Sequence, residues 1–106
     1  MRLASRAQFT PPALRDLRSI WTWVADDSGE DRADQLIDRL ADATDRLVDL
    51  PELGTVKRAF GKGMRCFVVR SYLIFYRSAA KGIEIVRIID GRRDLQIAWL
   101  EDKPLP

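Results

Sequence analysis

Arginine and tyrosine side chains accumulate in the second half of the sequence, among apolar runs typical of β-strands. Guanidinium groups bind phosphates and can stabilise the charge that develops during phosphodiester cleavage. Proton transfer would then depend on Glu84, a tyrosine or a lysine, and each needs a strong pKa shift to act near neutral pH. We therefore predict a binding surface rather than a catalytic site; the simpler alternative is that these arginines only keep a sheet soluble. The set comprises Arg65, Arg77, Arg87, Arg92 and Arg93, with Tyr72 and Tyr76 between them.

The residue types that hold metals and cofactors are scarce. The chain contains no histidine and a single cysteine, Cys66, which leaves almost no ligand set for zinc. Cys66 lies within an apolar strand pattern and is interpreted as an unreactive core thiol. Neither a nucleophile elbow nor a glycine-rich phosphate loop occurs in the sequence. Asp26 and Asp27 are better explained by an exposed turn than by a cation site, so we expect no metal, no cofactor and no catalytic residue.

Composition places the chain among single-domain globular proteins. Its 106 residues are 46% apolar and 32% charged, enough for one modest core, so we predict one domain over residues 1–106. No apolar run is long enough to span a membrane, and the first residues lack a secretory signal pattern. We therefore expect a cytoplasmic location and no membrane partner. The first half is acidic and the second half basic, which indicates one positively charged face suited to acidic partners.

Two amphipathic helices are predicted after a short first strand at residues 2–9. Thr10 is suited to cap the first helix, and Pro11 fits its first turn. Ser28, with Asp31 three residues later, resembles a capping box for the second helix, and Pro51 ends that helix. Because the connection is so short, the helices should form an antiparallel hairpin. The first helix carries its apolar stripe at Leu14, Leu17, Trp21 and Val24.

Three further strands are predicted at residues 64–69, 72–77 and 83–89. The short connections between them suit hairpins, so the strands should form an antiparallel meander. Residues 94–102 are expected to form a last helical turn or a tail. The predicted fold class is therefore α+β: one strand, a helical hairpin, then a three-stranded antiparallel sheet.

The predicted strands are apolar on both faces, which is unusual for a small antiparallel sheet with helices on one side. In the last strand, Ile83 and Ile85 occupy one parity while Val86 and Ile88 occupy the other. Either the first strand and the C-terminal tail cover the second face, or a partner protein does. We favour a partner.

Four sequence segments, taken in order, resemble the ParE branch of the RelE/ParE superfamily of toxins from type II toxin–antitoxin systems. The likeness runs from about Phe9 to Leu95. "ALRDLRSIWTWVADDSGEDRADQLIDRL" is similar to the helical hairpin of that family, and "LVDLPELG" to the end of its second helix. "GMRCFVVRSYLIFYR" and "GIEIVRIIDGRRDL" are similar to its strands.

The resemblance implies a small toxin that binds DNA gyrase and is neutralised by a ParD-like antitoxin, whose C-terminal segment wraps around it in a hetero-oligomer. The RelE branch instead cleaves mRNA on the ribosome, and a third alternative is a non-toxic member that only binds antitoxin and represses its operon. Asp90 stands where that superfamily often has histidine, and no tyrosine follows Arg93, which favours the ParE-like alternative. The positions matched to the family motifs are Arg65, Arg77, Arg87, Arg93 and Asp94, to which Arg92 is added as basic surface. The residues predicted to contact the antitoxin are Leu17, Trp21, Val24, Tyr72, Ile74, Tyr76, Val86 and Ile88.

Overall fold

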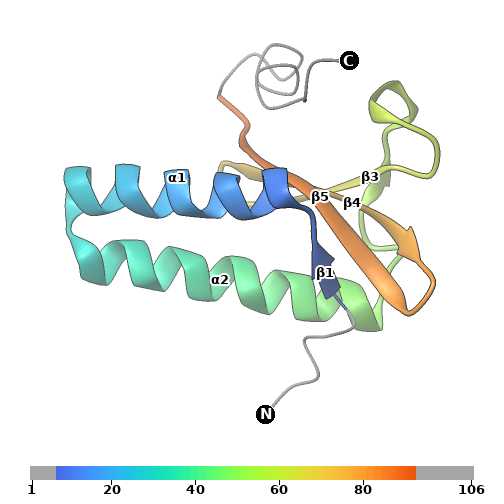
Figure 1. Cartoon of the computed structure of the whole chain (residues 1–106), viewed down its shortest axis with the longest axis horizontal. Helices are drawn as coiled ribbons and strands as arrows, with labels where there is room; N and C mark the ends of the chain where they lie inside the picture. Colours follow the sequence, from blue (N-terminus) through green and yellow to red (C-terminus); the bar gives the residue numbers. More distant parts are fainter. Residues whose placement is uncertain (1–6, 93–106) are drawn as a thin grey trace.

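A helical hairpin lies against one face of a five-stranded sheet in the computed structural model, which describes residues 7–92 (Figure 1). Helix α1 spans Pro11–Ser28 and helix α2 spans Glu30–Asp49. The Thr10 hydroxyl accepts a hydrogen bond from the Ala13 amide at 3.2 Å, so the predicted cap of α1 is confirmed. Within residues 7–92, neither helix combines the length and the apolar character that a membrane span requires.

The connection between the helices differs from the prediction. Ser28 is the last residue of α1, and its hydroxyl donates to the Asp27 carboxylate at 2.9 Å instead of capping α2. Gly29, at a φ of 94°, links the two helices, and no side chain caps α2. Since a positive φ is unfavourable for residues with a Cβ, glycine fits this tight reversal where serine would not. The predicted capping box is therefore wrong.

The sheet contains the predicted antiparallel meander and one further strand at each edge. The meander strands are β3 (Arg65–Val69), β4 (Tyr72–Ala79) and β5 (Gly82–Asp90). Strand β1 (Ala7–Phe9) pairs in parallel with β5, and the two-residue β2 (Thr55–Val56) pairs with β3. The strand order is β1-β5-β4-β3-β2. The fold class is α+β as predicted, but the sheet is mixed rather than purely antiparallel. The predicted residues 2–6 of the first strand and the predicted C-terminal tail or helix lie outside the described residues.

The main core lies between the hairpin and the sheet. Leu40 and Leu47 of α2 pack with the sheet side chains that face the helices, and all of them are almost completely buried. Each such side chain stabilises the fold by about 1.5–3 kcal/mol through removal of apolar surface from water. The sheet contributes Tyr72, Ile74, Tyr76, Ile83, Ile85 and Ile88 to this core.

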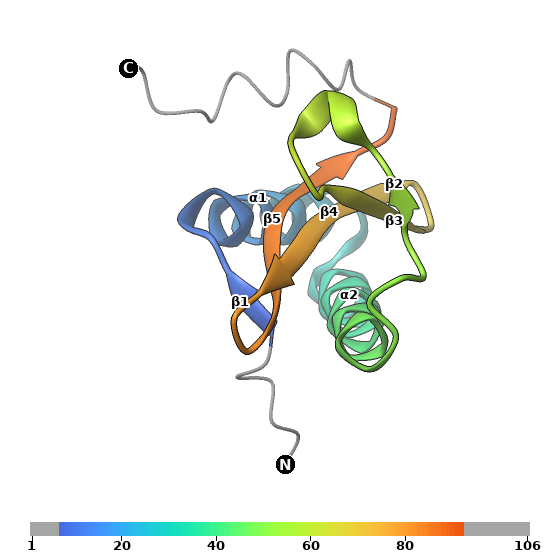
Figure 2. The same cartoon turned by 90° about the vertical axis from the view of Figure 1, so that its right-hand side faces the viewer.

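The second face of the sheet has its own cover, which corrects the prediction that a partner covers it. A smaller core forms there from Met64, Cys66, Phe75 and Ile89. The segment that leads into β3, with a 3₁₀ helix at Arg58–Phe60, folds over this face opposite the helices (Figure 2). The Phe60 ring lies 4.7 Å from the Phe75 ring, centroid to centroid. The apolar residues of both strand parities are therefore explained by two cores within the same chain.

Candidate functional site

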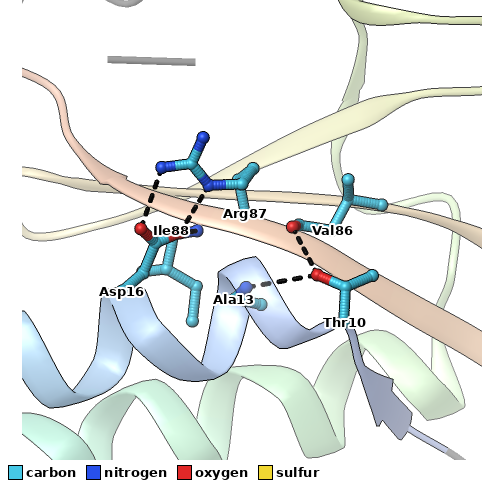
Figure 3. A network of polar contacts seen from close by, with 6 residues as sticks. All are labelled: Thr10, Ala13, Asp16, Val86, Arg87 and Ile88. Atoms are coloured by element: carbon cyan, nitrogen blue, oxygen red, sulfur yellow. Dashed lines mark hydrogen bonds and ion pairs between the residues drawn. The ribbon is translucent and has the colours of Figure 1, made fainter. Parts of the chain in front are cut away.

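The strand arginines are the first candidates for function, and Arg87 proves to be a core residue. Its Nε donates to Asp16 Oδ2 at 2.7 Å and its Nη2 donates to Asp16 Oδ1 at 2.9 Å (Figure 3). Arg87 is 4% exposed and Asp16 is 8% exposed. Asp16 also accepts the Ile88 amide at 2.8 Å. Arg87 is therefore unavailable as target-binding surface, and that prediction is wrong.

A bulge in β5 explains why Asp16 is needed at this place. Phe75 pairs with Arg87 while Tyr76 pairs with Ile85, so one residue of β5, Val86, has no opposite partner. Strand β1 is too short to satisfy the β5 edge beyond this point, and unpaired buried backbone groups are costly. The start of α1 supplies the partners instead, since the Thr10 hydroxyl donates to the Val86 carbonyl at 2.8 Å and Asp16 accepts from Ile88 (Figure 3).

The other predicted basic residues are held by separate contacts rather than gathered in one site. Arg65 donates to the Gly54 carbonyl at 2.8 Å, which fixes the turn after α2. Arg77 pairs with Glu84 at 3.0 Å on the exposed surface. Arg92 pairs with Asp90 at 2.6 Å, and this hydrogen bond raises the pKa of the Arg92 guanidinium. Arg93 and Asp94 lie outside the described residues.

The residues predicted to contact an antitoxin divide into two groups. Tyr72, Ile74, Tyr76 and Ile88 are at most 7% exposed and pack against the hairpin of the same chain. The premise that they form an open sheet face is therefore wrong. Val86 is partly buried and packs on the second core.

The predicted contacts on α1 remain partly accessible. Leu17 packs on the edge of the main core, and Val24 is half-buried near the end of the hairpin. Trp21 is also half-buried, and its indole N–H donates to the Asp34 carboxylate of α2 at 2.8 Å. Leu14 and Trp23 are exposed on the same helix. Antitoxin binding by this helix stays a prediction.

A cleft at the connected end of the hairpin was not predicted. We call it the arginine cleft; it lies between α1, α2 and the β3–β4 turn and has a volume of about 250 Å³. Its basic residues are Arg32 and Arg39 of α2 and Arg70 of the turn. The seven-residue spacing of Arg32 and Arg39, continued by Arg46, places them on one helix face and is the sequence signal that could have revealed this cleft. The remaining lining residues are Val24, Ser28, Gln35, Leu36 and Tyr72.

Tyr76 joins the main core to the turn that follows α2. Its hydroxyl accepts from the Gly54 amide at 2.8 Å and donates to the Pro51 carbonyl at 2.7 Å. Burial raises the pKa of the Tyr76 hydroxyl above 10.0, and burial also raises the pKa values of Tyr72 and Cys66. A buried thiol with a raised pKa is a poor nucleophile, which agrees with the interpretation of Cys66 as a core residue.

These raised pKa values predict a loss of stability in alkaline solution. The three groups bind their protons more tightly in the folded state than in the unfolded state. Their contribution to the free energy of unfolding is therefore complete below their pKa values in the unfolded state, and it is lost as the pH rises through their pKa values in the folded state. We expect the free energy of unfolding to fall progressively from about pH 9 upward. Urea denaturation between pH 7.5 and about 10.5 measures this, with a shallower decline expected for Tyr76→Phe. A flat or rising profile above pH 9 would contradict it.

Within residues 7–92, no group of three histidine, cysteine or acidic side chains is arranged to hold a metal ion. The described arrangement offers arginine cations, an apolar helix surface and a cleft. These features suit binding to proteins or anions.

A family model described as "ParE toxin of type II toxin-antitoxin system, parDE" matches residues 7–95. Toxin ParE1 of Mycobacterium tuberculosis is 32% identical over 94 residues, which cover 88% of this chain and 96% of that protein. Toxin ParE3 of Caulobacter vibrioides is 30% identical over 86 residues, which cover 81% of this chain and 86% of that protein. A chain of the chromosomal ParDE TA system from P. aeruginosa shares the fold, with a TM-score of 0.69 at 20% identity over 79% of this chain and 92% of that one.

The family model spans both helices and all the strands of the described structure. The resemblance noted in the sequence is confirmed, and the chain belongs to the ParE toxin family of type II toxin–antitoxin systems.

Proposed function

We propose that this chain is a toxin that poisons DNA gyrase and is held inactive by a small antitoxin encoded beside it. The observation that carries the proposal is the family match over residues 7–95. The relatives that it resembles are themselves named as ParE toxins, and the structural neighbour belongs to a ParDE system.

The contacts of the strand arginines support an inhibitor that acts by binding rather than by cleaving RNA. Nuclease chemistry on this sheet would need cations free to bind phosphate and a group to move protons. The Arg87 side chain is paired with Asp16 in the core, and the Arg65 side chain donates a hydrogen bond to the Gly54 carbonyl. The sequence has no histidine, and the raised pKa values of the Tyr72 and Tyr76 hydroxyls keep both groups protonated near neutral pH, so neither can accept a proton as a general base.

The accessible part of α1 is the surface that we assign to the antitoxin. Leu14 is 42% exposed and Trp23 is 59% exposed; the half-buried Leu17 and Trp21 lie between them along the helix, and Val24 follows Trp23. Exposed aromatic and aliphatic side chains on a small domain favour a partner that lays an amphipathic helix or strand over them.

The direct test is a gyrase assay with the purified chain. We expect loss of supercoiling and accumulation of cleaved DNA in the presence of gyrase and ATP, both relieved by a stoichiometric amount of the product of the neighbouring gene. A parallel cell-free translation reaction serves as the control and should proceed normally. Prompt arrest of translation with mRNA cuts and intact gyrase activity would favour the RelE-type alternative. Harmless expression without the antitoxin would instead favour a member that only binds its partner.

A further inference from the structure

We propose that the arginine cleft is a binding site for a phosphate monoester. This site borders the α1 surface proposed above for the antitoxin and shares Val24 with it, but phosphate binding does not depend on that function. Three features support it: the positive charge of the cleft lining, the backbone conformation of the β3–β4 turn, and the chemical match between three guanidinium groups and one phosphoryl group.

The cleft lining contains three positively charged side chains and no negatively charged one. Arg32, Arg39 and Arg70 come from two different elements and line one space, and none of its lining residues is acidic. Within residues 7–92, these three arginines form no ion pair and no side-chain hydrogen bond, in contrast to Arg77 and Arg87. An unpaired cluster of this kind attracts anions because the like charges repel one another until a ligand neutralises them.

Helix geometry directs Asp31 and Asp38 away from this cluster. Arg32 and Arg39 are two turns apart, so they point to the same side of the helix at a separation of roughly 10 Å along its axis. Asp31 and Asp38 each precede an arginine by one residue and therefore project about 100° away around the helix. Asp42 stands three residues after Arg39 and is its neighbour on the helix surface, but it does not line the cleft, whereas Arg32 and Arg39 do.

The backbone at Arg70 has a conformation that arginine rarely adopts. Arg70 has a φ of 58°, and it is the only residue other than glycine with a positive φ in the described chain. Val69 pairs with Tyr72, so Arg70 and Ser71 form a two-residue connection in which glycine or asparagine is normally preferred. An arginine at such a conformation is under strain, and strained residues are concentrated at ligand sites.

Three guanidinium groups match a phosphoryl group better than a carboxylate. A phosphate monoester presents three terminal oxygens and close to two negative charges, whereas a carboxylate presents two oxygens and one charge. The other polar groups of the lining, the Gln35 amide and the Tyr72 hydroxyl, can also donate hydrogen bonds. The cleft volume of about 250 Å³ exceeds the space that one phosphate needs, and Val24 and Leu36 provide an apolar wall for the rest of the ligand.

Titration of the complete chain with phosphate compounds tests the proposal. The probes are inorganic pyrophosphate, adenosine 5′-monophosphate and a short 5′-phosphorylated oligonucleotide, measured by calorimetry at constant ionic strength. We expect saturable binding of one ligand per chain, weakened at least tenfold by Arg39→Gln and by Arg70→Gly. Arg15→Gln and Arg18→Gln are matched controls, because they remove the same charge from exposed positions of α1, and they should change the affinity less than twofold.

Arg70→Gly should not destabilise the fold, since glycine relieves the strain at a positive φ. Its melting temperature should therefore equal or exceed that of the parent. Equal weakening by the control variants, or the absence of saturable binding by any probe, would overturn the proposal. So would glutarate binding as tightly as the phosphate probes, because the site would then be one for carboxylates of an acidic peptide. Tighter binding of the 5′-phosphorylated oligonucleotide than of the same oligonucleotide with a 5′-hydroxyl would support the proposal and identify a nucleic-acid end as the source, whereas equal binding of the two would overturn it.

Discussion

Asp16→Ala is expected to lower the free energy of unfolding by about 3–5 kcal/mol, because it leaves the Arg87 guanidinium buried without its counter-charge. Asp16 accepts two hydrogen bonds from Arg87 and one from the Ile88 amide, all in the interior. The loss would remove a large part of the 5–15 kcal/mol that typically stabilises a domain of this size. Urea denaturation followed by circular dichroism measures it.

Two further variants distinguish the free-energy cost of an unpaired buried charge from the cost of simply removing a carboxylate from α1. Asp26→Ala removes an exposed carboxylate from the same helix and should change the stability by less than about 0.5 kcal/mol. The double variant Asp16→Leu/Arg87→Met replaces the ion pair with apolar groups and should recover part of the stability lost in Asp16→Ala, while the Ile88 amide still lacks its acceptor. If Asp16→Ala costs no more than Asp26→Ala, the pair does not anchor α1 to β5.

Gly54→Ala is expected to cost about 3 kcal/mol, since an added methyl group has no room. A Cβ at this position would lie 2.6 Å from the Tyr76 hydroxyl oxygen and 3.0 Å from the Cys66 carbonyl oxygen. Tyr76 is 1% exposed and cannot move outward without disturbing the main core. The variant must therefore break the hydrogen bonds through which Tyr76 holds the turn after α2.

Tyr76→Phe isolates the hydrogen-bond part of this effect. It leaves the buried Gly54 amide without its acceptor and should cost about 1–3 kcal/mol. The double variant should be less destabilised than the sum of the two single variants, because both remove the same hydrogen bond. Glu52→Ala, in the same turn but exposed, is the control and should have little effect. Additive losses in the double variant would show that the clash does not act through Tyr76.

The parts of the fold that were predictable are those with local signals. Thr10 and Pro11 mark the start of α1 through side-chain and backbone preferences that act within one turn. The three meander strands follow from apolar alternation and short connections. The family likeness follows in turn from the order of these elements, and it is confirmed over residues 7–95.

The parts that were not predictable depend on contacts between distant residues. Asp16 stands between Arg15 and Leu17 and looks like any surface position of an amphipathic helix. Its burial becomes evident only when the β5 bulge places Arg87 beside it. The cover over the second sheet face was also missed, because its segment is rich in glycine and resembles an irregular loop. A partner was therefore assigned to apolar residues that the chain covers itself.

The separation of Asp16 from Arg87 has a consequence for how the toxin is made. The two residues are 71 positions apart, and Thr10 and Val86 are 76 apart. The helical hairpin therefore leaves the ribosome long before the strand that completes it, and contacts of such long sequence separation form late in folding. A product released early by an interrupted ribosome has neither the β1–β5 pairing nor a partner for Asp16. We therefore expect a chain that ends before Ile88 to lack the contacts that anchor α1 to β5 and to fold less stably than the full chain.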